Sequence, residues 1–257
     1  MAGDYAVTVA VPSLPPVHAV LRRITGADEV VLAPGRPGEP TRLLAALARA
    51  GDGAPLELAA LPVTVHDRLL AEVYRREVGD TANCRASCAT CAKPFEFDLV
   101  LPDLLAAQDR DAAGCEPPGA DGRWRLARLR VRPPTLADAA RGPQAVPAVL
   151  CDPAADAGAL AAVAAFLERA CPLLALDLDA ACPHCGAAQC LAFDLPRFLL
   201  RTIANDRPFL VRETHLIAAR YGWSHAGIMA LPRDDRRAYA ALIESERGAG
   251  LRPRVVA

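Results

Sequence analysis

Two segments of the chain alternate apolar and polar residues, and each contains a Cys-x-x-Cys motif. In PLLALDLDAACPHCGAAQCLAFDL, Leu174, Leu176 and Leu178 alternate with small or acidic residues before the cysteines. In TANCRASCATCAKPFEFDLV, Phe95 and Phe97 alternate with polar residues after them. Successive side chains of a strand point to opposite faces, so a period of two indicates strands. Each segment therefore predicts a strand, a Cys-x-x-Cys turn and a second strand.

The two segments also resemble each other. Cys88 and Cys182 are 94 residues apart, and Asp98 and Asp194, which follow them, are 96 residues apart. A leucine pair follows each aspartate. This correspondence predicts a degenerate internal repeat.

Elsewhere the apolar positions follow a helical period. HDRLLAEVYRREVGD places an apolar stripe on one face and predicts a helix that Thr64 caps and Gly79 ends. Thr25 and Thr135 each precede an aspartate by three residues, which is the spacing of a capping box. Further helices are predicted after Thr41, over 158–170, and throughout the chain after Leu195. In the last of these, Tyr239, Leu242 and Ile243 should face inward. RWRLARLRVR at 123–132 predicts a hairpin or a bulged strand, and GAGLRPRVVA at 248–257 predicts a frayed tail.

These patterns predict an α+β fold with a zinc-ribbon-like pair of Cys-x-x-Cys hairpins. The expected segments are an N-terminal α+β part (1–80), a central β core with inserted strands and a helix (81–200), and a C-terminal helical module (201–257).

The net charge, the N-terminal sequence and the longest apolar run bear on the expected partners and localisation. The formal net charge is −1, with 29 Lys and Arg against 30 Asp and Glu, which argues against a chain built to neutralise phosphates or anionic lipid. Asp4 stands where an export signal carries positive charge, and the apolar run at 158–167 is too short for a membrane span. The expectation is a soluble protein of the bacterial cytoplasm.

The nine cysteines suggest a metal. Disulfides seldom persist in the cytosol, and an odd number cannot all pair within one chain. Zn²⁺ takes four thiolates tetrahedrally, and two Cys-x-x-Cys turns supply them. The predicted ligands of a structural zinc ion are Cys88, Cys91, Cys182 and Cys185, with Cys84 and Cys190 as possible substitutes. The alternative is a set of reduced thiols without metal; Cys115, Cys151 and Cys171 stand alone.

Cys182-Pro183-His184-Cys185 has a second reading, the redox dithiol of a thiol oxidoreductase. A redox Cys-x-x-Cys lies at the N-terminus of a helix, where the dipole lowers the thiol pKa. Here Gly186 and a short alternating run follow, which favours a turn into a strand. His184 is expected to point away from the metal.

Sequence motifs of common catalytic and phosphate-binding sites are absent. There is no HExxH, no GxxxxGK[ST], no GxGxxG and no serine or cysteine nucleophile signature, so neither an enzyme nor a small-molecule substrate is expected. Asp98, Asp177, Asp179 and Asp194 are expected on solvated strand faces. A zinc-ribbon regulator or nucleic-acid binder is an alternative, with RWRLARLRVR as its contact surface.

Several stretches occur in an order that resembles one protein family: LRRITGADE (21–29), RVRPPTLAD (130–138), CPHCG (182–186) and ETHLIAARYGWSHAGIMALPRDDRRAYAALIE (213–244). The chain resembles the baseplate hub assembly chaperone family of T-even-type contractile phage tails and its relatives in phage-derived contractile injection systems. The first Cys-x-x-Cys motif, at Cys88 and Cys91, departs from the family pattern, because proline and glycine are missing around its cysteines.

The resemblance implies a non-enzymatic protein that helps to build, or remains within, a contractile-tail baseplate. Its partners would be baseplate and hub proteins. Aromatic residues and methionine are enriched at interfaces, so Tyr221, Trp223 and Met229 are the candidate contacts. Trp223 lies in an expected connection between helices and is the strongest of them.

Overall fold

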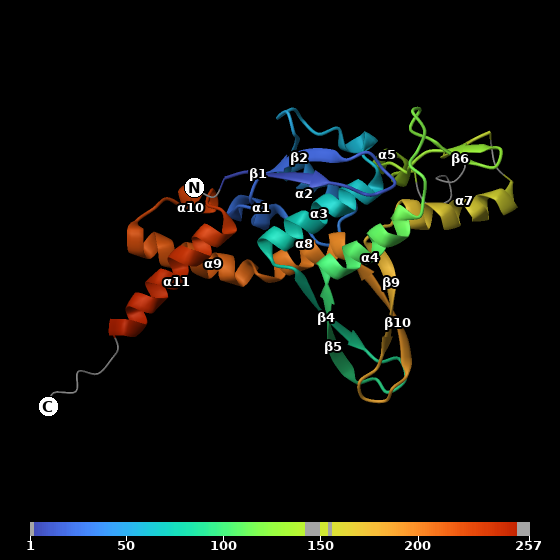
Figure 1. The fold of residues 1–257 in the computed structure, drawn as a ribbon. Helices are drawn as coiled ribbons and strands as arrows, with labels where there is room; N and C mark the ends of the chain where they lie inside the picture. Colours follow the sequence, from blue (N-terminus) through green and yellow to red (C-terminus); the bar gives the residue numbers. More distant parts are fainter. Residues whose placement is uncertain (1–2, 142–149, 154–155, 251–257) are drawn as a thin grey trace.

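The computed structural model describes residues 3–141, 150–153 and 156–250, and it is an α+β fold as predicted. Helices and two small sheets form a body, from which two β-hairpins project together (Figure 1). The C-terminal helices lie at one end of the body, and β6 and α7 lie at the other.

The N-terminal part of the body is a three-stranded antiparallel sheet with helices packed on it. Its strands run in the order β1 (Tyr5–Val9), β2 (Val17–Leu21) and β3 (Ala48–Ala50). The helices that follow are α1 (Gly26–Val31), α2 (Glu39–Leu47) and α3 (Val63–Glu77), with a short 3-10 turn, η1 (Leu58–Ala60), before α3.

Helix α3 runs through the centre of the body. Leu69, Leu70, Val73 and Tyr74 of its predicted stripe are buried, and α3 packs against α2, α8 and β1. Two predicted caps were wrong. Thr64 lies within α3, whose cap is Pro62, and Thr41 lies within α2, which begins after the left-handed Gly38 and has Pro40 in its first turn.

A second three-stranded sheet lies at the other end of the body, in the order β6 (Trp124–Leu126), β7 (Leu129–Val131) and β8 (Cys151–Asp152). The predicted hairpin of RWRLARLRVR is confirmed as β6 and β7. The adjoining helices are α4 (Leu101–Ala113), α5 (Leu136–Ala139) and α7 (Ala157–Ala170). Phe166 of α7 packs edge-on against Trp124, with ring centroids 5.2 Å apart.

Both Cys-x-x-Cys segments form the predicted hairpins. The first consists of β4 (Thr81–Ser87) and β5 (Pro94–Val100), and the second of β9 (Ala175–Ala181) and β10 (Ala188–Asp194). Every strand has seven residues, and the register pairs Ser87 with Pro94 and Ala181 with Ala188. Each hairpin therefore closes around its own Cys-x-x-Cys turn.

The chain after β10 is helical, as predicted, through the end of the described residues. The helices are α8 (Leu195–Asn205), α9 (Arg207–Tyr221), α10 (His225–Met229) and α11 (Arg233–Gly250). Ile243 is buried and Tyr239 half-buried, but Leu242 is exposed, because it lies on the outer face of α11. The predicted tail at 248–257 begins inside α11, and residues 251–257 lie outside the described part.

The internal repeat extends beyond the cysteines. An Arg-x-x-Thr-x-x-Asp motif follows the middle strand of each sheet, and in each the arginine pairs with the aspartate that completes the capping box. Arg22 Nη1 lies 2.6 Å from Asp28 Oδ2, and Arg132 Nη1 lies 2.5 Å from Asp138 Oδ2. We name these two motifs the arginine boxes.

Each arginine box contacts a Leu-Pro sequence at the start of a distant helix. The first box pairs Thr25 with Pro232 before α11, and the Arg233 N–H donates to the Ile24 carbonyl over 3.0 Å. The second pairs Thr135 with Pro62 before α3. The repeats are therefore interlocked, since each box contacts a helix of the other half.

The main apolar cluster spans the first two predicted segments. It contains residues from Val9 to Ile203, including Leu69 of α3 and Phe193 of β10, so residue 80 is not a break in the core. A separate cluster holds the C-terminal helices together. Helices α9, α10 and α11 therefore form a packing unit of their own, whereas α8, which carries Ile203, packs with the main cluster.

Candidate metal centre

The tips of the two hairpins bring four sulfur atoms together. Cys88 Sγ lies 3.7 Å from Cys185 Sγ, and Cys91 Sγ lies 3.8 Å from Cys182 Sγ. All four sulfurs lie within 4.8 Å of one another, and they are the four predicted ligand atoms. The arrangement is compatible with a metal site that two distant parts of the chain share.

The spacing fits a single tetrahedral ion. Metal–sulfur bonds of about 2.3 Å at tetrahedral angles place the sulfurs about 3.8 Å apart. The two closest pairs, Cys88 with Cys185 and Cys91 with Cys182, each join one hairpin to the other and match that value. A disulfide requires a sulfur–sulfur distance of about 2.05 Å, so these pairs are not disulfides.

The backbone of each turn is arranged around its first cysteine. The Thr90 and Cys91 N–H groups donate to Cys88 Sγ over 3.3 and 3.4 Å, and the His184 N–H donates to Cys182 Sγ over 3.4 Å. Such donors stabilise negative charge on sulfur. The turns also close identically, because the residue four positions after the first cysteine donates to its carbonyl in both.

That closing residue has a left-handed backbone in both turns. In the second turn it is Gly186, with φ of 74°, and in the first it is Ala92, with φ of 58°. The glycine missing from the first turn is therefore replaced by an alanine that keeps the same conformation. An L-residue other than glycine carries a steric cost in this region.

We expect Ala92→Gly to stabilise the protein by about 0.5 kcal/mol and Gly186→Ala to destabilise it by about 1 kcal/mol. The Cβ of the alanine at 186 would have no atom within 4 Å, so the effect comes from the backbone alone. Urea unfolding of the metal-loaded protein measures both changes. Equal stability of the two variants would contradict a left-handed turn at these positions.

The electrostatics of the four thiols favour a bound cation. The Cys91 N–H, together with the Thr90 N–H and the neighbouring thiols, lowers the pKa of Cys88 to about 6. At Cys185 the Ala187 N–H acts to lower the pKa, but burial and hydrogen bonds with the other three thiols raise it to about 12. The first thiolate thus forms readily, whereas the last forms only when a positive charge compensates the others.

Contacts between the hairpins surround the four sulfurs. Ala86, Phe95 and Phe97 of the first hairpin pack with Leu191 of the second around the sulfurs. The Ala89 N–H donates to Gln189 Oε1 over 2.9 Å. An apolar contact and a polar crosslink therefore join the two tips beside the sulfur cluster.

His184 and Gln189 have roles that the sequence analysis missed. The predicted bystander His184 lies outside the sulfur cluster, but its Nε2 is 3.0 Å from the Pro94 carbonyl of the other hairpin. Gln189 is buried in a strand whose inward positions are otherwise apolar. This single polar residue on the inner face of β10 was the sequence signal that could have revealed the contact between the hairpins.

The possible substitute ligands lie elsewhere. Cys84 is buried in β4, its Sγ lies 3.6 Å from the Ala82 carbonyl, and burial raises the pKa of its thiol. Cys190 is exposed in β10, opposite Asp179. Neither belongs to the cluster of sulfurs. Cys151 and Cys171 are buried and Cys115 is half-buried in the body.

The surroundings of Cys182 differ from those of a redox dithiol. The turn leads into strand β10, and the next helix, α8, begins ten residues after Cys185. Of the four aspartates near the turns, Asp98, Asp177 and Asp179 are exposed as expected, with Asp98 accepting from Asn83 over 2.7 Å. Asp194 departs from the expectation, because it is half-buried and its carboxylate accepts from the Arg197 N–H as the cap of α8.

The predicted partner contacts lie at the C-terminal helices. Tyr221, Trp223 and Tyr239 form an aromatic cluster with ring centroids 5.2 to 5.8 Å apart, and Tyr221 and Trp223 remain 37% and 40% exposed. Met229 is buried against Gly26 and Thr214, so it is an internal contact and not an exposed one. Its apolar side chain is used to join α10 to α1.

The basic segment at 123–132 is partly neutralised. Arg128 pairs with Asp156, Arg130 with Asp121 and Arg132 with Asp138. Carboxylates so close to the guanidinium groups compete with phosphates for them.

No helix among the described residues is both long and apolar enough to cross a membrane. Comparison of the chain with protein-family models, with curated proteins and with solved structures finds no match.

Proposed function

We propose that the chain is a non-enzymatic assembly factor or structural subunit of the baseplate or hub of a contractile tail, in a phage or in a phage-derived injection system. The order of its sequence motifs, above all residues 213–244, resembles that family. It would act in the bacterial cytoplasm or as part of the assembled tail particle.

The observation that carries the proposal is the exposed aromatic cluster of Tyr221, Trp223 and Tyr239. Tryptophan and tyrosine dominate the binding energy of protein interfaces, and monomeric proteins seldom expose them together. Trp223 stands on the short connection between α9 and α10, where its ring contacts the rings of Tyr221 and Tyr239. A solvent-facing aromatic surface suits a protein partner.

Zinc is the metal we propose for the four cysteines. Cys₄ sites with tetrahedral spacing are typical of structural zinc, and no position among the four sulfurs is left open for a substrate. The ion would fix the angle between the hairpins and so make the projecting pair a rigid element. A protein that positions other subunits benefits from such rigidity.

The principal experiment is co-expression with the proteins of a contractile tail. We expect the tagged chain to co-purify with a hub or baseplate protein and Trp223→Ala to weaken that complex about 30-fold, as for a hot-spot residue worth about 2 kcal/mol. Leu242→Ala is the matched control, because Leu242 is 49% exposed on α11 but lies outside the aromatic cluster. Failure of the wild type to retain any tail protein would overturn the proposal.

The alternatives predict different results. A nucleic-acid binder would show binding that weakens steeply with salt in a filter assay, and the ion pairs of Arg128, Arg130 and Arg132 argue against it. A thiol oxidoreductase using Cys182 and Cys185 would cycle between dithiol and disulfide. Bound zinc with unreactive thiols would exclude that activity.

A further inference from the structure

The C-terminal helices form a packing unit of their own, which we call the C-terminal unit (residues 206–250). Its apolar cluster contains Leu216, Ile217, Ile228, Ala240 and Ile243, and none of these belongs to the main cluster of the body. Two further buried residues, Leu210 and Met229, lie where the unit meets α1.

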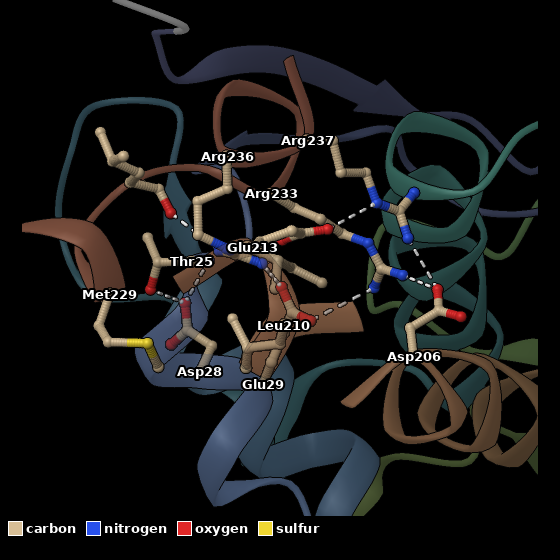
Figure 2. A network of polar contacts seen from close by, with 12 residues as sticks. Thr25, Asp28, Glu29, Asp206, Leu210, Glu213, Met229, Arg233, Arg236 and Arg237 are labelled. Atoms are coloured by element: carbon tan, nitrogen blue, oxygen red, sulfur yellow. Dashed lines mark hydrogen bonds and ion pairs between the residues drawn. The ribbon is translucent and has the colours of Figure 1, made fainter. Parts of the chain in front are cut away.

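Charged side chains fill much of the junction between this unit and the body. Figure 2 shows Arg233 and Arg236 of α11 directed toward Glu29 of α1, and the side chains of these three residues are only 1 to 2% exposed. Arg236 Nη2 lies 2.5 Å from Glu29 Oε1, and Arg236 Nε lies 3.1 Å from Glu213 Oε2. One carboxylate of the body thus holds an arginine of the unit.

Four more ion pairs lie at or beside the junction. Arg233 and Arg237 both contact Asp206, the residue between α8 and α9. Arg23, which follows β2, lies between Glu77 of the body and Asp234 of α11, at 2.7 and 2.6 Å. The charged residues of the unit therefore meet the body at Glu29 of α1 and at Arg23, which also pairs with Glu77 of α3, whereas the Asp206 pairs lie within the unit at its first residue.

This junction should open more readily than the apolar cores on either side of it. Ions lose hydration when they are buried, and the Coulombic attraction between them often only offsets that loss. The Arg233 Nε and Nη1 atoms have no hydrogen-bond partner among the described residues, and Nη1 is 3.9 Å from Glu29 Oε2. Opening would return all of these groups to water, whereas opening the main core would expose apolar surface.

The connectivity allows the unit to move as a whole. Asp206 alone separates α8 from α9, so the chain enters the unit through one residue. The other attachments are non-covalent: the contacts between Thr25 and Pro232 and between Arg233 and Ile24, the packing of Met229 on Gly26, and the hydrogen bonds that Arg207 donates to the carbonyls of Glu29, Val30 and Leu32.

We propose that this junction is a latch, from which α9, α10 and α11 open together by pivoting at Asp206 while Arg233 and Arg236 leave Glu29. A groove of about 340 Å³ has Val30 of α1 as one wall and Leu210, Val211 and Met229 as the other. Opening would separate these walls and change the position of Trp223 relative to the hairpins. The latch does not depend on the identity of the partner.

Methionine oxidation tests the latch in the full-length, metal-loaded protein. The chain has two methionines, Met1 and Met229, and Met229 is buried at the junction. Hydrogen peroxide adds one oxygen atom to the thioether and leaves water, and peptide mass spectrometry measures the rate at residue 229. We expect Glu29→Gln to raise that rate at least tenfold, because it removes the carboxylate that Arg236 contacts.

Gly26→Ala provides a second variant with unchanged charge. Its Cβ would lie 3.1 Å from Met229 and from Arg236 Nη1. The added methyl group should therefore push α10 and α11 away from α1 and raise the oxidation rate as well. Glu244→Gln is the matched control, because it removes an exposed carboxylate that pairs with Arg212 inside the unit. The control should oxidise at the wild-type rate.

Hydrogen exchange separates opening from unfolding. In both latch variants the amides of α3 and of central α9, around Leu216 and Ile217, should exchange at wild-type rates while Met229 oxidises faster. A wild-type oxidation rate in both variants would overturn the latch. So would faster oxidation accompanied by equally faster exchange in α3, since that would be global unfolding.

Discussion

Replacing Cys185 with serine is expected to reduce bound zinc from one ion per chain to nearly none. Three thiolates remain in the variant, but a structural zinc site needs four, and the serine hydroxyl stays protonated at neutral pH. Cys185 is exposed, so the substitution removes a ligand without opening a cavity in the core. Metal analysis of the purified protein, with inductively coupled plasma mass spectrometry, measures the change.

Loss of the ion should loosen the hairpins more than the body. Structural zinc contributes about 10 to 16 kcal/mol in small peptides at neutral pH, and here it would join ligands that are more than 90 residues apart. We expect amide exchange in β4, β5, β9 and β10 to rise strongly near the tips, where only a small apolar cluster and the Gln189 crosslink remain. The α3 amides, inside the main core, should change least.

Cys190→Ser is the matched control for this experiment. Cys190 is also exposed and lies in the same hairpin, but outside the four-sulfur cluster. It should keep one zinc ion per chain. Unchanged zinc content in Cys185→Ser would refute the ligand assignment.

The hairpins and the cysteine cluster at their tips could be predicted because their signals are local. A period of two fixes which side chains of β9 face inward, and Cys-x-x-Cys within a tight turn fixes where two sulfurs lie. The pairing of Cys88 and Cys91 with Cys182 and Cys185 needed one further step, the recognition that the flanking sequences match. The helices with long apolar stripes, such as α3, were predictable for the same reason.

The junction at the C-terminal unit could not be predicted, because its contacts join residues far apart in the sequence. Glu29 and Arg236 are 207 positions apart, and each is typical of an exposed helix face when the sequence is taken alone. Met229 was expected at the surface for a related reason, since a five-residue helix gives no periodicity that identifies its inner face. Gln189 could not be interpreted from its own strand, because its partner, the Ala89 N–H, lies on the other hairpin.

Asp138→Asn is expected to destabilise the protein by about 2 to 3 kcal/mol, somewhat less than a fully buried ion pair would lose, because Arg132 is partly exposed. The Asp138 carboxylate accepts hydrogen bonds from the guanidinium of Arg132 and from the N–H and hydroxyl of Thr135. An amide presents one acceptor oxygen where the carboxylate has two and carries no charge to balance Arg132. Thermal or urea unfolding measures the loss. Asp121→Asn, at the exposed pair with Arg130, should leave the stability nearly unchanged, because solvent screens that pair.

The pH dependence of this effect identifies the charge as its cause. Hydrogen bonds from Arg132, together with those from Thr135, hold the pKa of Asp138 well below its usual range. A carboxyl whose pKa is lower in the folded state stabilises the fold above its unfolded pKa of about 3.9, and that contribution is lost as the pH falls toward the folded value. The difference in stability between the wild type and Asp138→Asn should therefore be constant near pH 6 and shrink as the pH falls below about 4. If the stability difference between the wild type and Asp138→Asn stays the same from pH 6 to pH 3, the charge of the Asp138 carboxylate is not the cause of the effect. The second arginine box would then not depend on that charge to hold α5 against the start of α3.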